Sequence, residues 1–143
     1  MSEFHGNFQP EDSVNIGDLT PSPQIMALLQ ELQGMLSALI ERGEESRIDI
    51  RSLPLFPGDH DLLMQFLGEG EVKAHIDTLG VSEIKETRFS GIWWLLHYNT
   101  HDEIVAEIIE VTLLPDILKT QAPDLIHSRT LLNEYLETLS SHD

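Results

Sequence analysis

Hydrophobic residues recur at helical spacing in three separate stretches of the chain. The first stretch follows Ser22-Pro23, where serine can cap a helix and proline suits the first turn, and it ends at Gly43. The second runs over residues 59–67 and the third follows Pro123-Asp124. Such spacing predicts three amphipathic helices. Their stripes contain Ile25, Leu28, Leu29, Leu32, Leu36, Leu39 and Ile40, then Leu62, Leu63, Phe66 and Leu67, then Leu125, Arg129, Leu132, Leu136 and Leu139.

Between these helices the pattern changes to alternation, which is typical of strands. Residues 47–52 and 71–79 alternate between apolar and polar positions, which predicts two strands. The second strand is expected to expose one face to solvent. Residues 83–89 are expected to be extended, with a bulge that repairs a break in the alternation. The apolar runs 92–96 and 104–114 flank a short polar loop and predict a central antiparallel hairpin. The order predicts an α+β fold in which about three helices pack with an antiparallel sheet of four to five strands.

The first 22 residues lack this regularity. They contain scattered glycine, proline and asparagine without a sustained period, so we expect a flexible N-terminal tail. The remaining residues, 23–143, are predicted to form a single domain, because a domain commonly takes about 100–200 residues.

The central hairpin has apolar side chains on both faces. Trp93 and Trp94 are adjacent in the sequence, so in a strand they point to opposite sides of the sheet. If the three helices all cover one face, the second face is left exposed as a surface for a partner or for self-association. If the helices divide between the two faces, no such surface exists, and the sequence leaves both outcomes open.

Charge and composition then narrow the classes of partner. The chain has 25 acidic and 8 basic residues and a formal net charge of −17, which disfavours nucleic acids and anionic membrane surfaces. It contains no cysteine, which excludes disulfides, thiol catalysis and iron–sulfur clusters held by thiolates. No apolar run approaches the ~20 residues of a membrane helix, and the start lacks the features of a signal peptide. We therefore expect a cytoplasmic protein.

No motif for catalysis or for a bound cofactor stands out. The glycines of Gly68-Glu69-Gly70-Glu71 lack the third glycine of a nucleotide motif and follow a predicted helix rather than a strand. His97 and His101 lie near carboxylates, yet their spacing matches no metal motif. Carboxylates are plentiful, but no spacing places two of them in one pocket, and no nucleophile motif appears. The sequence predicts no catalytic residues, no metal site and no cofactor.

Arg88 is one of the few basic residues. Strand alternation puts it on the same side as Glu86, where a cross-strand ion pair would help to fix the register. The alternative is a guanidinium exposed beside aromatic residues, which are types enriched in binding hot spots.

Two segments resemble a known family. Phe66-Leu67-Gly68-Glu69-Gly70-Glu71-Val72 and Ile84-Lys85-Glu86-Thr87-Arg88-Phe89-Ser90-Gly91-Ile92-Trp93 are similar to motifs of the HupH or HyaF hydrogenase expression/formation family. The resemblance runs from about Leu53 to Pro115. Family members are about twice as long and contain two related halves, of which this chain resembles the C-terminal one.

The resemblance implies an accessory role in the maturation of an uptake nickel–iron hydrogenase, through binding of the iron–sulfur small subunit before assembly or export. It also implies a thioredoxin-like maturation partner, and a homodimer that restores two domains is a further hypothesis. Two other functions remain open, namely a small-molecule-binding domain with a cleft beside the hairpin and a carboxylate-based hydrolase. The residues expected to contact a partner are Glu69, Glu71, Glu86, Thr87, Arg88 and Trp93, and those expected to shape the backbone are Gly68, Gly70 and Gly91.

Overall fold

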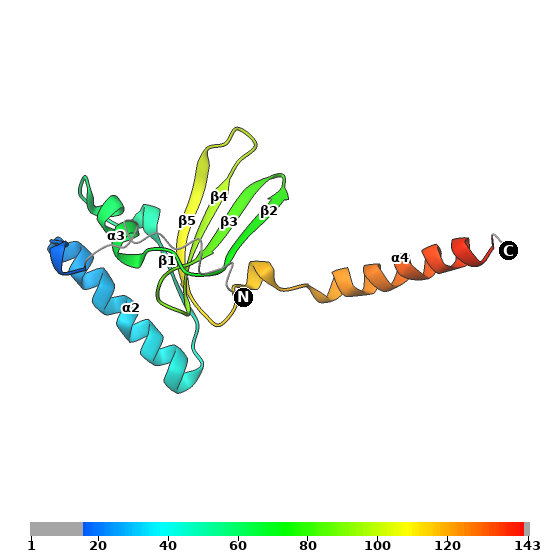
Figure 1. The fold of residues 1–143 in the computed structure, drawn as a ribbon, viewed down its shortest axis with the longest axis horizontal. Coiled ribbons are helices and arrows are strands. Elements are labelled where there is room, and N and C mark those ends of the chain that lie inside the picture. The colour runs from blue at the N-terminus through cyan, green and yellow to red at the C-terminus, as the bar shows by residue number, and fades with distance from the viewer. Residues whose placement is uncertain (1–15, 142–143) are drawn as a thin grey trace, which may run out of the picture. The chain divides into compact units, whose positions relative to one another are not determined.

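The computed structural model describes residues 16–141 (Figure 1). The chain forms two compact units, one ending at Leu113 and one beginning at Leu114. Most of the tail expected over residues 1–22 lies outside the described residues, and the part that is described contains a short 3-10 helix, η2 (Ile16–Asp18). The single domain over residues 23–143 stays a prediction.

The first unit is built on one five-stranded sheet. The strands lie in the order β1-β5-β4-β3-β2, and every neighbouring pair is antiparallel. Together with the helices this confirms the predicted α+β fold. The elements of this unit after η2 are α2 (Pro23–Arg42), β1 (Ser46–Asp49), η3 (Ile50–Ser52), α3 (Asp59–Leu67), β2 (Lys73–Thr78), β3 (Gly80–Glu86), β4 (Ile92–Tyr98) and β5 (Ile104–Val111).

Helix α2 begins and ends at the residues that its sequence indicates. The Ser22 hydroxyl accepts a hydrogen bond from the Ile25 amide at 3.2 Å, which satisfies one of the free amides of the first turn. Gly43 ends the helix with a φ of +67°, a conformation that glycine adopts without a steric penalty.

Helices α2 and α3 both pack on one face of the sheet (Figure 1). Their buried side chains meet alternate residues of the two central strands, as the period of two in a strand requires. This helix-side core consists of Ile25, Leu28 and Leu32 from α2, Leu63 and Leu67 from α3, Ile92, Trp94 and Leu96 from β4, Ile109 and Val111 from β5, and Ile48 and Ile50.

The other face of the central strands is also buried. Ile84 lies directly opposite Leu95 in the β3–β4 register, and these residues are 0% and 2% exposed. Trp93, on the same face, is 4% exposed. Helices α2 and α3 lie on the same face of the sheet, which is the arrangement for which the sequence predicted an exposed second face. In the middle of the hairpin, however, that second face is buried. Exposed apolar residues of the hairpin lie near its loop, at Ile104 and Val105.

The predicted extension over residues 83–89 is too long. Strand β3 ends at Glu86, and residues 87–91 turn the chain into β4. The break in alternation marks the end of the strand, and the register irregularity of this sheet lies instead in β4, between His97 and Tyr98.

A buried carboxylate lies within the helix-side core. Glu107 is 6% exposed, and its Oε2 accepts a hydrogen bond of 2.8 Å from the Trp94 indole Nε1. The same oxygen lies 2.7 Å from His60 Nε2. The His60 ring meets Trp94 edge-on with a centroid distance of 5.7 Å. These partners offset the desolvation of the carboxylate and connect α3 to the two central strands.

We expect Glu107→Leu to lower the free energy of unfolding by about 1–3 kcal/mol, because the buried Trp94 N–H would lose its acceptor. Glu107→Gln keeps an oxygen acceptor and should lose less. Urea unfolding of both variants measures the difference. Equal stability of the two variants would contradict this role for the carboxylate.

Candidate functional site

The two motifs that resemble the known family lie side by side in the structure. The segment 67–72, which leaves α3, contacts the segment 86–91, which joins β3 to β4. We call these two segments together the motif junction. Three backbone hydrogen bonds connect them: Arg88 N–H to Leu67 O at 2.8 Å, Gly70 N–H to Glu86 O at 2.7 Å, and Glu86 N–H to Val72 O at 2.9 Å.

Two glycines of the motif junction lie where an added Cβ would come closer than 3.0 Å to a neighbouring group. Gly68 has a φ of +62°, and an added Cβ would lie 2.6 Å from Arg88 Nε. At Gly70 an added Cβ would overlap the carbonyl oxygen of Thr87, which is backbone and therefore hard to displace. The third glycine of the set, Gly91, has a φ of +91°, and its added Cβ would make only an ordinary contact with Leu36.

Arg88 binds the end of α3. Its Nη2 donates a hydrogen bond of 3.1 Å to the carbonyl oxygen of Gln65, a favourable place for a cation because the last carbonyls of a helix lack partners within the helix. Within residues 16–141 it forms no ion pair with Glu86, which corrects the sequence expectation. The reason is that β3 ends before Arg88. Beside it, Phe66 and Phe89 stack at a centroid distance of 5.6 Å.

Thr87 and Trp93 are buried, which corrects their expected place at a partner surface. The Thr87 hydroxyl lies 2.9 Å from Ile92 O and accepts a hydrogen bond from the Phe89 amide, so it closes the turn. The Trp93 indole N–H donates to Thr112 O at 3.1 Å. In this structure neither side chain reaches the surface.

The other four expected contact residues differ in exposure. Glu69, Glu71 and Arg88 are exposed, whereas Glu86 is partly buried. Lys85 Nζ lies 3.8 Å from Glu69 Oε1. A hollow of about 100 Å³ lies beside this pair, lined by Met64, Gly68, Glu69, Lys85 and Trp94, and it is smaller than the usual ligand pocket. Contact of these four residues with a partner stays a prediction.

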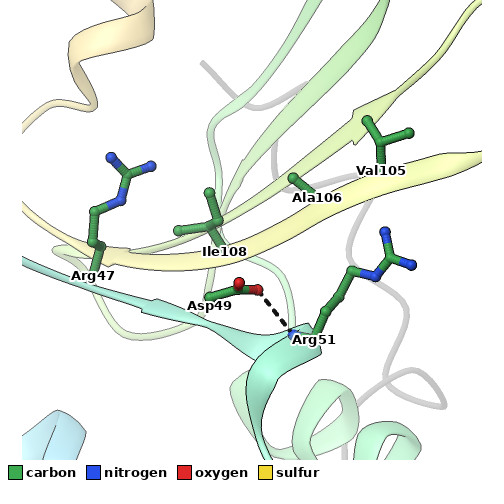
Figure 2. Close-up of a pocket in the computed structure, with 6 residues that line it drawn as sticks. All are labelled: Arg47, Asp49, Arg51, Val105, Ala106 and Ile108. Atoms are coloured by element: carbon green, nitrogen blue, oxygen red, sulfur yellow. Dashed lines mark hydrogen bonds between the residues drawn. The ribbon is translucent and has the colours of Figure 1, made fainter.

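A larger hollow lies at the β1 edge of the sheet. Its volume is about 610 Å³, and Figure 2 shows the side chains of Arg47 and Arg51 on either side of Asp49, Ala106 and Ile108. Arg51 is held there by a hydrogen bond of 2.8 Å from its Nη1 to Ile104 O. The hollow is lined by Arg47, Asp49, Arg51, Val105, Ala106 and Ile108.

The sequence reasoning missed this hollow. Its signal was the nearness of Arg47 and Arg51, two of the eight basic residues of the chain. The strand predicted over residues 47–52 is too long, because β1 ends at Asp49 and Arg51 lies in η3. The hollow differs from the apolar cleft that the small-molecule hypothesis requires, since charged side chains form its rim.

Across residues 16–141, no group of three or more His, Asp or Glu side chains is placed to hold a metal ion. His97 Nδ1 lies 2.7 Å from the Ser82 hydroxyl. Burial, together with the charges of Glu83 and Glu107, raises the pKa of Tyr98 above its ordinary value. In the same range no helix has the length and apolarity to cross a membrane.

The family is settled by a match across most of the chain. Residues 24–139 match the family described as HupH hydrogenase expression protein, C-terminal conserved region. The chain belongs to this family. The resemblance inferred from the two motifs is thereby confirmed, and the matched region extends beyond the stretch 53–115 on which the inference rested.

Similar proteins carry matching descriptions. The chain is 32% identical over 140 residues to hydrogenase expression/formation protein HoxQ of Azotobacter vinelandii, covering 88% of this chain and 48% of that one. It is 42% identical over 78 residues to hydrogenase-1 operon protein HyaF of Escherichia coli, covering 50% and 26%. The solved structure of hydrogenase expression protein HupH from Thiobacillus denitrificans matches with a TM-score of 0.78 and 35% identity, covering 83% and 99%.

The HupH family match concerns only part of the longer relatives. The chain spans about half the length of the HoxQ protein, whereas nearly all of the solved HupH chain is covered. The structural match also confirms the α+β fold with its five-stranded antiparallel sheet.

Proposed function

We propose that this HupH-family chain is an accessory factor in the maturation of an uptake nickel–iron hydrogenase. In this proposal it binds the iron–sulfur small subunit before that subunit is assembled or exported, and it carries out no catalytic step of its own. The observation that carries the proposal is the match of residues 24–139 to hydrogenase expression proteins. A thioredoxin-like maturation protein is a second proposed partner.

Side-chain chemistry supports binding rather than cofactor handling. The chain has no cysteine, so it lacks the thiolates that hold iron–sulfur clusters in proteins. Any effect of this chain on a subunit that carries an iron–sulfur cluster would therefore act through protein–protein contact. The net charge of −17 suits a client with a basic surface, because opposite potentials speed the encounter of two proteins.

Helix α4 (Ala122–Ser140), which follows the short η4 (Asp116–Leu118), offers a surface for such contact. Within this second unit no α4 residue is buried. Leucines and a tyrosine form an exposed stripe along one side of the helix, and carboxylates such as Glu134 and Glu137 lie on the other side. Exposed apolar stripes of this kind favour a protein partner. We assign the small-subunit contact to this α4 stripe, which consists of Leu125, Leu132, Tyr135, Leu136 and Leu139.

The other functions considered from the sequence have less support. A hydrolase would need paired carboxylates around an open cavity, whereas the buried Glu107 is engaged by Trp94 and His60. A small-molecule domain would favour an enclosed apolar pocket, whereas the larger hollow is rimmed by Arg47 and Arg51.

Deletion of the gene in its own host tests the maturation role. We expect hydrogen uptake by the cells to fall to near background while the messenger RNA of both hydrogenase subunits persists, because an accessory factor acts after translation. A plasmid copy of the wild-type gene should restore uptake. Unchanged uptake in the deletion strain would contradict the proposal.

A further inference from the structure

Strand β2 forms an outer edge of the sheet (Figure 1). One side of β2 pairs with β3 along its full length, from Lys73 opposite Lys85 to Thr78 opposite Gly80. Among residues 16–141, no strand pairs with its other side. An edge strand carries unpaired N–H and C=O groups that can pair with a strand of another chain.

The side chains of β2 complement themselves. Opposite residues of an antiparallel pair share one face of the sheet. If two copies of β2 pair about His75, Lys73 lies opposite Asp77 of the second copy, and this happens twice by symmetry. On the other face Ala74 lies opposite Ile76 of the second copy, again twice. Lys73, His75 and Asp77 are exposed, so they are accessible to such a partner.

Other registers fit less well. A shift by one residue would place apolar side chains opposite charged ones, because it exchanges the faces. A shift by two in one direction would put Lys73 opposite His75, and a shift in the other direction would leave Lys73 beyond the paired segment. The charges therefore favour the register centred on His75.

We propose that two copies of this chain pair through β2, antiparallel and centred on His75, so that their sheets join into one. The interface is isologous, as in most homodimers. It provides a specific reason for association despite the net charge of −17 on each copy. This proposal does not depend on the proposed function.

A charge swap tests the dimer, with oligomeric state measured by sedimentation equilibrium. The full-length wild-type chain is expected to dimerise. Lys73→Asp and Asp77→Lys each place like charges opposite one another twice, and each should raise the dimer dissociation constant roughly tenfold. The double variant Lys73→Asp/Asp77→Lys restores both pairs with the original net charge and should recover wild-type dimerisation.

Two further results complete the test. Glu31→Lys changes the net charge as Asp77→Lys does, but it lies on the exposed side of α2, so it should leave the dimer intact. Circular dichroism verifies that each variant is folded. The proposal is overturned if the folded wild type stays monomeric at high concentration, or if the single variants dimerise as well as the wild type. It is also overturned if the double variant remains as weak as the single ones.

Discussion

Replacement of Gly70 by alanine is expected to lower the free energy of unfolding by about 2–3 kcal/mol. An added Cβ would overlap the carbonyl oxygen of Thr87, and that oxygen belongs to the backbone of the turn. Relief would require the segment 67–72 to move away from the segment 86–91. Such movement would strain the 2.7 Å hydrogen bond from Gly70 N–H to Glu86 O and its two neighbours in the motif junction.

Gly34→Ala provides the matched control for this substitution. Gly34 lies within α2, and an added Cβ there would meet nothing within 4 Å. Because alanine favours a helix over glycine by about 1 kcal/mol, this variant should be as stable as the wild type or more stable. Urea unfolding of both variants measures the contrast. Equal losses at Gly70 and Gly34 would show that the close packing of the motif junction is unimportant.

The second large effect concerns binding by the α4 stripe. Leu132 and Leu136 lie near its centre, and each is more than half exposed. If they are buried against the small subunit, the double variant Leu132→Ala/Leu136→Ala should lose about 2 kcal/mol or more of binding free energy, which is roughly a thirtyfold rise in the dissociation constant. Isothermal titration calorimetry with the purified small-subunit precursor measures this change.

Thr130→Ala/Thr138→Ala is the control for the α4 stripe. Both threonines lie on the opposite side of α4, where their hydroxyls donate to the helix carbonyls of Ile126 and Glu134. Alanine has a high helix propensity, so both double variants should keep the helix. If the leucine variant binds as tightly as the threonine variant, α4 is not the contact surface.

The helix and strand positions were largely predictable because their signals are local. Ser22 and Gly43 mark the two ends of α2, and the apolar runs around the loop at residues 99–103 define the β4–β5 hairpin. The two motifs likewise indicated the family. Each of these signals depends on residues close together in the sequence, so no knowledge of tertiary packing was needed.

The burial of Trp93 and Thr87 was not predictable from the same pattern. A motif can contain residues that shape a turn as well as residues that touch a partner, and residue identity alone does not distinguish the two. In the structure the Thr87 hydroxyl lies 2.9 Å from Ile92 O and the Trp93 indole N–H donates to Thr112 O, so both side chains are bonded within the fold. Both bonds depend on the three-dimensional course of the turn and of the strand ends.

Long-range partners were also beyond the sequence pattern. Glu107 stands out as a polar residue within an apolar strand, but its partner His60 lies 47 positions earlier in the chain. At the larger hollow, a hydrogen bond likewise connects Arg51 to the carbonyl oxygen of Ile104, and these residues are 53 positions apart in the sequence. Only the folded sheet brings these groups together.

The most direct test of the central claim is a titration of the purified full-length chain with the purified iron–sulfur small-subunit precursor from the same organism. The account predicts a saturable complex that forms with the precursor and that weakens when the α4 stripe is truncated. Absence of binding by a folded wild-type chain, over the concentrations at which the precursor stays soluble, would contradict it.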